Sequence, residues 1–238
     1  MSHLAELIPN LEELITEDDT PVDNLASEKQ QRLLTEPLYS SWSGPGDDRP
    51  FLAAANVGIF SMVRVPPVVP DMFLSLDVET PEQWWEKTHR SYMLWEFGKP
   101  PELVLEIVSN REGGENGEKK RKYAWMRVEY YVIYDPLRQI MPDVLTIHRL
   151  HGQAYEVESS TRFPGLRLGL TLWEGVFEGK QETWLRWTDT EGALIPTGKE
   201  RAEQERDRAN RERIRAEQAE QRIEQLLVLL RQSGVNPD

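Results

Sequence analysis

Apolar residues form short blocks between Phe51 and Phe177, and the spacing within these blocks predicts strands more often than helices. Residues 102–109, Glu-Leu-Val-Leu-Glu-Ile-Val-Ser, are almost continuously apolar, a pattern typical of a central strand covered on both faces. Residues 130–134 form a similar block, and a helix is expected between the two, over residues 118–127. Strand, helix and strand in this order favour a right-handed crossover at the centre of a mixed sheet.

Further elements are expected on both sides of this crossover, separated by turns rich in proline and glycine. The expected strands are residues 51–65, as one strand or a bent hairpin, residues 68–76, a hairpin of residues 144–150 and 154–157, and one or two short strands around residues 166–177. A helix is expected before all of them, around residues 27–34.

Residues 77–101 form an insertion in which aromatic residues mix with charged ones. Its large aromatic residues are Trp84, Trp85, Trp95 and Phe97. The pattern indicates either a helical flap that buries these side chains in its own core or a platform on which nucleic-acid bases stack.

The C-terminal segment repeats every seven residues. Four successive repeats begin at Arg201, Arg208, Arg215 and Arg222. One core position is taken by Ala202, Ala209, Ala216, Ile223 and Leu230, and the second by Ala219 and Leu226. The repeat predicts a long helix ended by Gly234, either single and solvated or self-associated, as a dimer, through residues 201–230.

Taken together, these patterns predict an α/β protein in three parts. Residues 1–50 form an N-terminal arm with a helix, and this arm is acidic, with three basic against eleven acidic residues. Residues 51–197 form the core, a mixed β-sheet flanked by helices. Residues 198–238 form the C-terminal heptad-repeat (coiled-coil) helix.

Composition limits the chemistry that is available. The chain has no cysteine, which excludes thiol nucleophiles and thiolate metal sites, and none of its four histidines lies in an H-E-x-x-H pattern. A metal site must therefore use carboxylates, which favours Mg²⁺ or Mn²⁺. No basic and apolar leader and no membrane-spanning stretch is evident, so we expect a cytoplasmic protein that does not contact a membrane. A formal net charge of −13 opposes strong nucleic-acid binding over the whole surface.

Glu106 is the unusual residue of the central strand, because an isolated carboxylate there would lose its hydration without compensation. Side-chain alternation places it on one face with Val104 and Val108. A cationic or metal partner is therefore expected on that face.

Two residues are candidates to meet Glu106. Asp71 follows Pro70 within an apolar block, where a proline marks an edge strand or a bulge that aims a side chain. Lys119 begins the predicted helix, on the face that also carries Tyr123. The simpler alternatives are an aspartate in a turn, a plain Glu106–Lys119 salt bridge, and a surface lysine within the basic run of residues 119–122.

The joint pattern of Pro70-Asp71, Glu106 in Leu-Glu-Ile-Val-Ser, and Lys119 in Gly-Glu-Lys, with Tyr-Val-Ile-Tyr-Asp-Pro from Tyr131, resembles the PD-(D/E)XK restriction-endonuclease-like superfamily. Within it, the chain is similar to a bacterial family of predicted restriction endonucleases, long classed as a domain of unknown function. The resemblance covers roughly residues 56–177. The lysine usual two residues after the glutamate is Val108 here, so its role falls to Lys119.

The resemblance implies a restriction-endonuclease-like core with a four-stranded mixed sheet. It implies Mg²⁺ or Mn²⁺ held by Asp71, Glu106 and the Ile107 carbonyl, and a water oriented or activated by Lys119. Possible accessory residues are Glu28, Ser109 and Tyr123.

Two functions remain open at this stage. The first is an Mg²⁺-dependent endonuclease with DNA as its substrate, supported locally by Arg111 and the basic run of residues 119–122. The second is a catalytically weak or inactive nuclease-fold scaffold that oligomerises through its C-terminal coiled coil.

Overall fold

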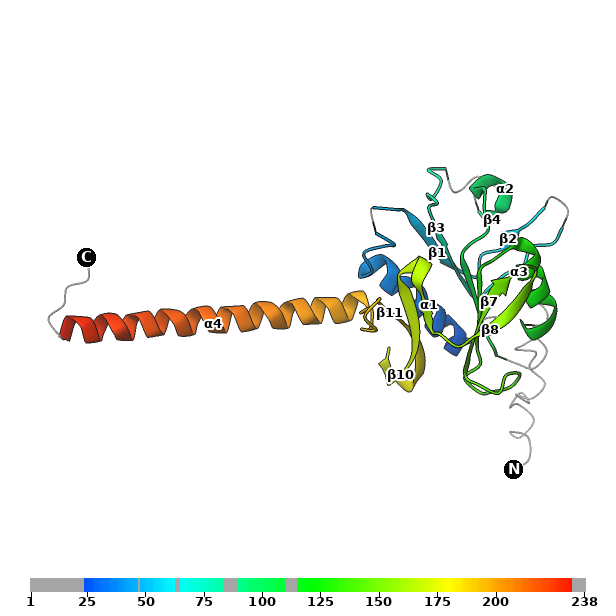
Figure 1. Ribbon diagram of the computed structural model, residues 1–238. Helices are drawn as coiled ribbons and strands as arrows, with labels where there is room; N and C mark the ends of the chain where they lie inside the picture. Colours follow the sequence, from blue (N-terminus) through cyan, green and yellow to red (C-terminus); the bar gives the residue numbers. More distant parts are fainter. Residues whose placement is uncertain (1–23, 47, 63–64, 84–89, 110–114, 233–238) are drawn as a thin grey trace, which may run out of the picture. The chain divides into compact units, whose positions relative to one another are not determined.

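The computed structural model describes residues 24–46, 48–62, 65–83, 90–109 and 115–232. The chain divides into two compact units, residues 1–195 and residues 196–238, and the strands all belong to the first (Figure 1). Among the described helices, none combines the length and the apolar character needed to cross a membrane.

A mixed sheet of six strands, in the order β1-β3-β5-β6-β7-β8, forms the centre of the first unit. Its strands are β1 (Phe51–Ala55), β3 (Met72–Leu76), β5 (Leu103–Ile107), β6 (Tyr130–Tyr134), β7 (Leu145–His151) and β8 (Ala154–Glu158). Strands β5 and β6 are parallel, and every other neighbouring pair in this sheet is antiparallel. The predicted mixed sheet is confirmed, with six strands instead of four because β1 and β8 extend its two edges.

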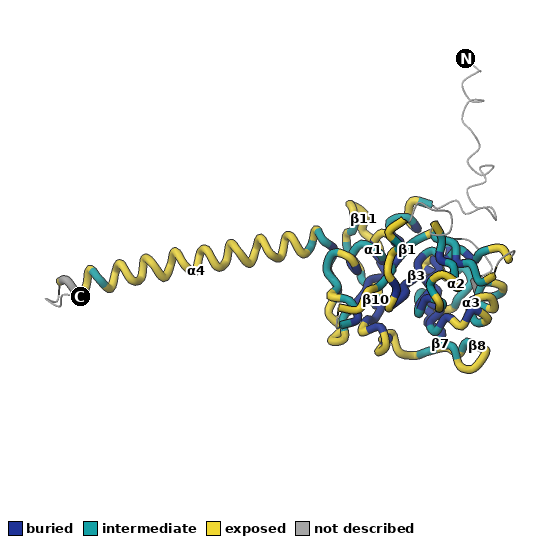
Figure 2. The backbone as a smooth tube through the Cα atoms, turned by 90° about the horizontal axis from the view of Figure 1, so that it is seen from above, coloured by how far each residue is buried: buried dark blue, intermediate teal, exposed yellow. Residues whose placement is uncertain are grey.

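Strand β5 is buried along its whole length and separates two apolar clusters. Leu103, Leu105 and Ile107 belong to one cluster, and Val104 and Val108 to the other. This is the alternation expected from the sequence, and it explains why the strand is apolar on both faces. Figure 2 shows the buried backbone concentrated at this sheet.

The first cluster lies between the central sheet, helix α1 (Leu25–Ser40) and a three-stranded sheet. That sheet consists of β9 (Arg162–Phe163), β10 (Leu168–Phe177) and β11 (Lys180–Thr188), with a 3-10 turn at Pro164–Leu166. Leu34 and Leu38 of α1 are buried there, so this helix packs in the core, whereas we expected it in an arm. Strand β11 was missed because its first four residues are exposed and polar.

The second cluster lies under helix α3 (Lys120–Met126), which follows a π-helical turn at Glu115–Lys119. Tyr123 and Met126 face the sheet from this helix, as predicted. A parallel pair of short strands, β2 (Ile59–Phe60) and β4 (Tyr92–Met93), and the short helix α2 (Leu94–Phe97) also contribute side chains to this second cluster.

The aromatic insertion is described only in part. Tyr92 and Phe97 stack with ring centroids 4.3 Å apart, whereas Trp95 is 44% exposed. Trp84 and Trp85 lie outside the described residues, so the choice between an aromatic core and a stacking platform stays open.

The second unit contains helix α4 (Gly198–Gln232). It begins with a capping box: the Glu200 backbone N–H donates to Thr197 Oγ1 at 3.2 Å, and the Thr197 N–H donates to Glu200 Oε2 at 2.8 Å. A long C-terminal helix is thus confirmed, while its heptad pairing stays a prediction and Gly234 lies outside the described residues.

Candidate active site

Glu106 lies in the middle of β5 and is completely buried. Two donors satisfy its carboxyl: Lys119 Nζ lies 2.8 Å from Oε2, and the Tyr123 hydroxyl donates to Oε1 at 2.7 Å. Both donors come from the helical segment that crosses from β5 to β6. The crossover therefore places a cation and a hydroxyl over a strand residue that could not be buried alone.

Asp71 lies immediately before β3, opposite Glu106. In the β3–β5 register Met72 pairs with Leu105, so one further step along the antiparallel pair brings Asp71 beside Glu106. The Ile107 N–H donates to Asp71 Oδ2 at 2.7 Å. The expectation that Pro70 marks an edge strand or a bulge is wrong, because β3 begins after it and runs between β1 and β5.

The two carboxyl groups influence each other electrostatically. Burial raises the pKa of Glu106 to about 8, Lys119 opposes this change, and Asp71 adds to it. Burial also raises the pKa of Asp71, against the Ile107 N–H and Lys119, which both lower it. Two desolvated carboxyls with a single ammonium nearby form a site that favours an additional positive charge.

Gln31 and Asn56 complete the surroundings of Asp71. Gln31, 4% exposed on α1, donates from Nε2 to Asp71 Oδ1 at 2.9 Å. The Asn56 side-chain amide donates to Gln31 Oε1 at 3.0 Å, and its backbone N–H donates to the Asp71 carbonyl at 3.3 Å. Neither residue was predicted from the sequence.

A signal for Gln31 does exist in the sequence. Ser27, Gln30 and Gln31 share the buried face of α1 with Leu34 and Leu38, at helical spacing. Polar residues on a face that is otherwise apolar indicate buried hydrogen bonds, which could have pointed to this helix as part of the site.

The other suggested accessory residues have different positions. Tyr123 contacts Glu106 directly, as described above. Glu28 lies on the outer side of α1 and pairs with Arg32, so the structure does not bring it to Asp71. The Ser109 carbonyl accepts from Gln139 Nε2 at 3.0 Å, at the C-terminal end of β5. Arg111 lies outside the described residues.

The donor set suits a hard divalent cation. Mg²⁺ and Mn²⁺ prefer oxygen ligands, and Mg²⁺ commonly keeps several waters while bound through one or two carboxylates. Asp71 and Glu106 supply these carboxylates, and their mutual repulsion would be relieved by a cation. No group of three or more histidine, cysteine, aspartate or glutamate residues that could hold a metal occurs in the described part of the chain.

Comparison with known proteins identifies the family of the chain. No curated protein and no solved structure matches the chain. A family model, Uma2, described as "Putative restriction endonuclease", matches residues 14–173, which include Gln31, Asp71, Glu106 and Lys119. Since the match covers more than half of the 238 residues, the chain belongs to the Uma2 family of restriction-endonuclease-like proteins.

Proposed function

We propose that this protein is a divalent-metal-dependent endonuclease that hydrolyses phosphodiester bonds in DNA. The observation that carries the proposal is the buried Glu106 beside Asp71, with Lys119 Nζ 2.8 Å from the glutamate. Membership in a family described as restriction endonucleases supports the substrate class.

Each residue has a distinct role in this proposal. Asp71, Glu106 and the Ile107 carbonyl would hold Mg²⁺ or Mn²⁺, which when bound neutralises phosphate charge and lowers the pKa of water. Lys119 orients the attacking water and stabilises the negative charge of the transition state. Tyr123 fixes the orientation of Glu106 through its hydroxyl, and Gln31 does the same for Asp71.

The reaction balances as a hydrolysis. The water oxygen forms a bond to phosphorus, the bond from phosphorus to one ester oxygen breaks, and a proton from the water ends on that leaving oxygen. The Lys119 side chain is 30% exposed, whereas Glu106 is fully buried. The lysine therefore lies at the boundary between the carboxylates and the solvent. That is where a phosphate would approach.

A plasmid-nicking assay with Mg²⁺ or Mn²⁺ tests the proposal directly. We expect Asp71→Asn, Glu106→Gln and Lys119→Met to reduce cleavage by about 100-fold or more, as the loss of a charge-stabilising group typically does. Lys122→Met is the matched control, because this lysine lies in the same basic run but pairs with Glu118. Equal nicking by all four variants and the wild type would refute the proposal.

Calorimetric titration with Mn²⁺ separates metal binding from cleavage. The wild type should bind the metal, and Glu106→Gln should bind it at least tenfold more weakly, since one of two carboxylates is lost. Absence of binding by the wild type at millimolar metal would favour the second function below.

We further propose that the chain self-associates as a dimer through α4. Such a dimer is also the basis of the second candidate function, a nuclease-fold scaffold without catalytic activity. The supporting observation is the exposure of apolar side chains on a helix of otherwise polar character: Ile223 is 57% exposed and Leu226 46%. Both occupy core positions of the heptad. Sedimentation velocity of the full chain measures the association.

A further inference from the structure

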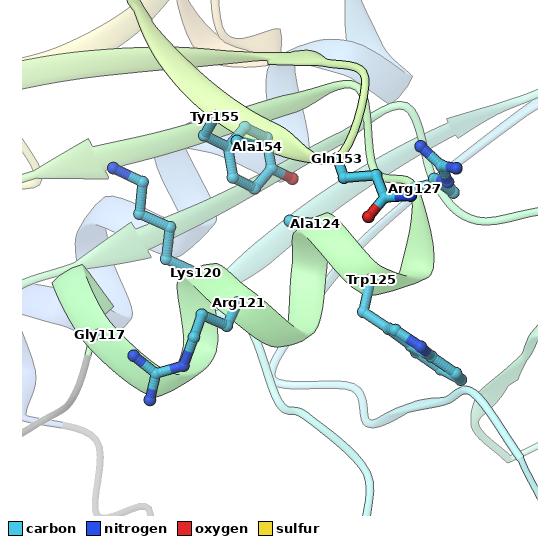
Figure 3. Close-up of a pocket in the computed structure, with 9 residues that line it drawn as sticks. All are labelled: Gly117, Lys120, Arg121, Ala124, Trp125, Arg127, Gln153, Ala154 and Tyr155. Carbon is cyan, nitrogen blue, oxygen red and sulfur yellow. The ribbon is translucent and has the colours of Figure 1, made fainter.

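A pocket of about 630 Å³ lies between α3 and the hairpin of β7 and β8, away from the carboxylates. Its lining includes Lys120, Arg121, Trp125, Arg127, Gln153 and Tyr155. Figure 3 shows Lys120 and Tyr155 on the hairpin side of the helix, Arg121 and Trp125 on its outer side, and Arg127 beside Gln153. A volume in this range is typical of small-molecule sites and accommodates a nucleotide.

The pocket is positively charged, in a chain whose net charge is −13. Among its lining residues, all of them described, three are basic and none is acidic. The basic run divides by function: Lys119 contacts Glu106, Lys122 pairs with Glu118, and Lys120 and Arg121 line the pocket. Partial burial lowers the pKa of Lys120, so a bound anion would stabilise its charged form.

Arg127 reaches the pocket from the C-cap of α3. Its backbone is left-handed, with φ of 67°, a conformation that glycine or asparagine adopts more readily at a helix end. Its guanidinium donates to the Gly152 carbonyl in the hairpin turn. This contact holds one cation of the pocket at the edge opposite Lys120.

Trp125 supplies an aromatic surface next to these cations. It is 60% exposed, although a tryptophan side chain has more apolar area to gain by burial than any other. Exposed aromatic rings beside lysine and arginine are the combination that binds single-stranded nucleic acid, where bases stack and cations contact phosphates. A paired base would not offer its face to such a ring.

We propose that this pocket binds a single-stranded segment of DNA, with successive phosphates at Lys120, Arg121 and Arg127 and a base stacked on Trp125. The choice of DNA rests on the proposed function. Lys120 directly follows Lys119 in the chain, so the pocket begins one residue beyond the proposed active site. The substrate class is then DNA with an unpaired stretch.

Fluorescence anisotropy with a labelled oligonucleotide of about 15 nucleotides tests this, using the full chain in EDTA so that no cleavage occurs. We expect Trp125→Ala to weaken binding about tenfold, the usual effect of losing one stacked base. Lys120→Gln/Arg121→Gln should weaken it further and reduce the salt slope by about 0.7 for each lost phosphate contact. Lys199→Gln/Arg211→Gln is the matched control from outside the pocket, and this variant should bind like the wild type.

Three results would overturn the proposal: no binding of the single strand by the wild type, equal losses in pocket and control variants, or tighter binding of a blunt duplex than of the single strand. The assay is independent of catalysis. If Asp71→Asn cleaves DNA as well as the wild type while binding still depends on Trp125, the proposed active site fails and the pocket stands.

Discussion

At the scale of single residues, Glu106 is under a strong physical constraint. It is fully buried in a strand, and only Lys119 and Tyr123 donate to its carboxyl among the described side chains. A carboxyl group in this position is stable in its neutral form, or in its charged form with a cation beside it. Its titration is therefore linked to the stability of the fold.

Stability of the metal-free protein should decrease as the pH rises through this titration. The pKa of Glu106 is raised from 4.5 to about 8, so the folded state binds the proton more tightly between these values and loses stability as the pH increases. Burial lowers the pKa of His148 from 6.5 to about 4. This histidine therefore makes the fold less stable as the pH falls below 6.5, and it does not contribute above that pH. Between pH 6.5 and 8, urea denaturation in EDTA should show a loss of about 1 to 2 kcal/mol.

Glu106→Gln is the control for this experiment, because it removes the titrating group and keeps the side-chain shape. Its free energy of unfolding should change much less than that of the wild type between pH 6.5 and 8. Parallel pH profiles for the two proteins would contradict the assignment of the dependence to Glu106.

Tyr123→Phe should destabilise the fold by about 1 to 3 kcal/mol at neutral pH, since it leaves a buried acceptor of Glu106 without its donor. At pH 9, above the pKa of Glu106, the same change should cost less in the Glu106→Gln background, because a neutral amide requires less compensation than a carboxylate. Denaturant melts of the four proteins give the coupling energy directly. Additive effects would show that the hydrogen bond contributes nothing specific.

At the scale of elements, helix α1 links the site to the core. Its Asn24 cap accepts from the backbone N–H groups of Ala26 and Ser27. Gln30 exchanges two hydrogen bonds with the backbone of Leu185 in β11. One turn of this helix thus contacts the second sheet through Gln30 and the Asp71 carboxylate through Gln31, so the candidate site depends on how the helix docks.

Leu34→Ala should destabilise the protein by about 2 to 5 kcal/mol, the cost of a cavity at a fully buried leucine. Leu25→Ala, at the 84% exposed start of the same helix, is the matched control and should change the free energy of unfolding by less than about 0.5 kcal/mol. Thermal or chemical denaturation measures both. Similar small effects would mean that α1 is not part of the cooperative core.

At the scale of the whole molecule, the chain combines a compact α/β unit with a helical unit whose surface is largely exposed. A helix of this length is stabilised by its charged pairs, such as Arg201–Glu205 and Arg208–Glu212, more than by burial. Its exposed apolar residues gather toward the C-terminal end. Self-association would bury them.

Ile223→Lys/Leu226→Lys should abolish the proposed dimer, because it places charges at both heptad core positions. Val228→Lys is the matched control: Val228 is similarly exposed, at 45%, but lies outside the core positions of the repeat. Sedimentation velocity of the full-length variants distinguishes the outcomes. A monomeric wild type, or equal dissociation by both changes, would contradict pairing through this face.

Much of the fold could be predicted from local patterns. Strand β6 has the predicted bounds, and the parallel crossover and the alternation along β5 agree with the structure. Alternation in a strand and its continuous apolar character follow from backbone geometry, so they are visible in the sequence. Strand β11 and the core position of α1 were not visible, since their burial depends on partners more than 100 residues away. The hydrogen bond from the Trp187 indole N–H to the Leu34 carbonyl illustrates this.

The sequence by itself determined that Glu106 must have a partner, because the cost of burying a carboxylate in an apolar strand does not depend on the rest of the fold. It also led to Asp71 and Lys119 as candidates. Only the tertiary structure decided that all three meet, that Gln31 and not Glu28 reaches Asp71 from α1, and that the neighbouring Lys120 and Arg121 face a separate pocket. These placements depend on strand register and on the rotation of each helix about its axis, which long-range packing sets.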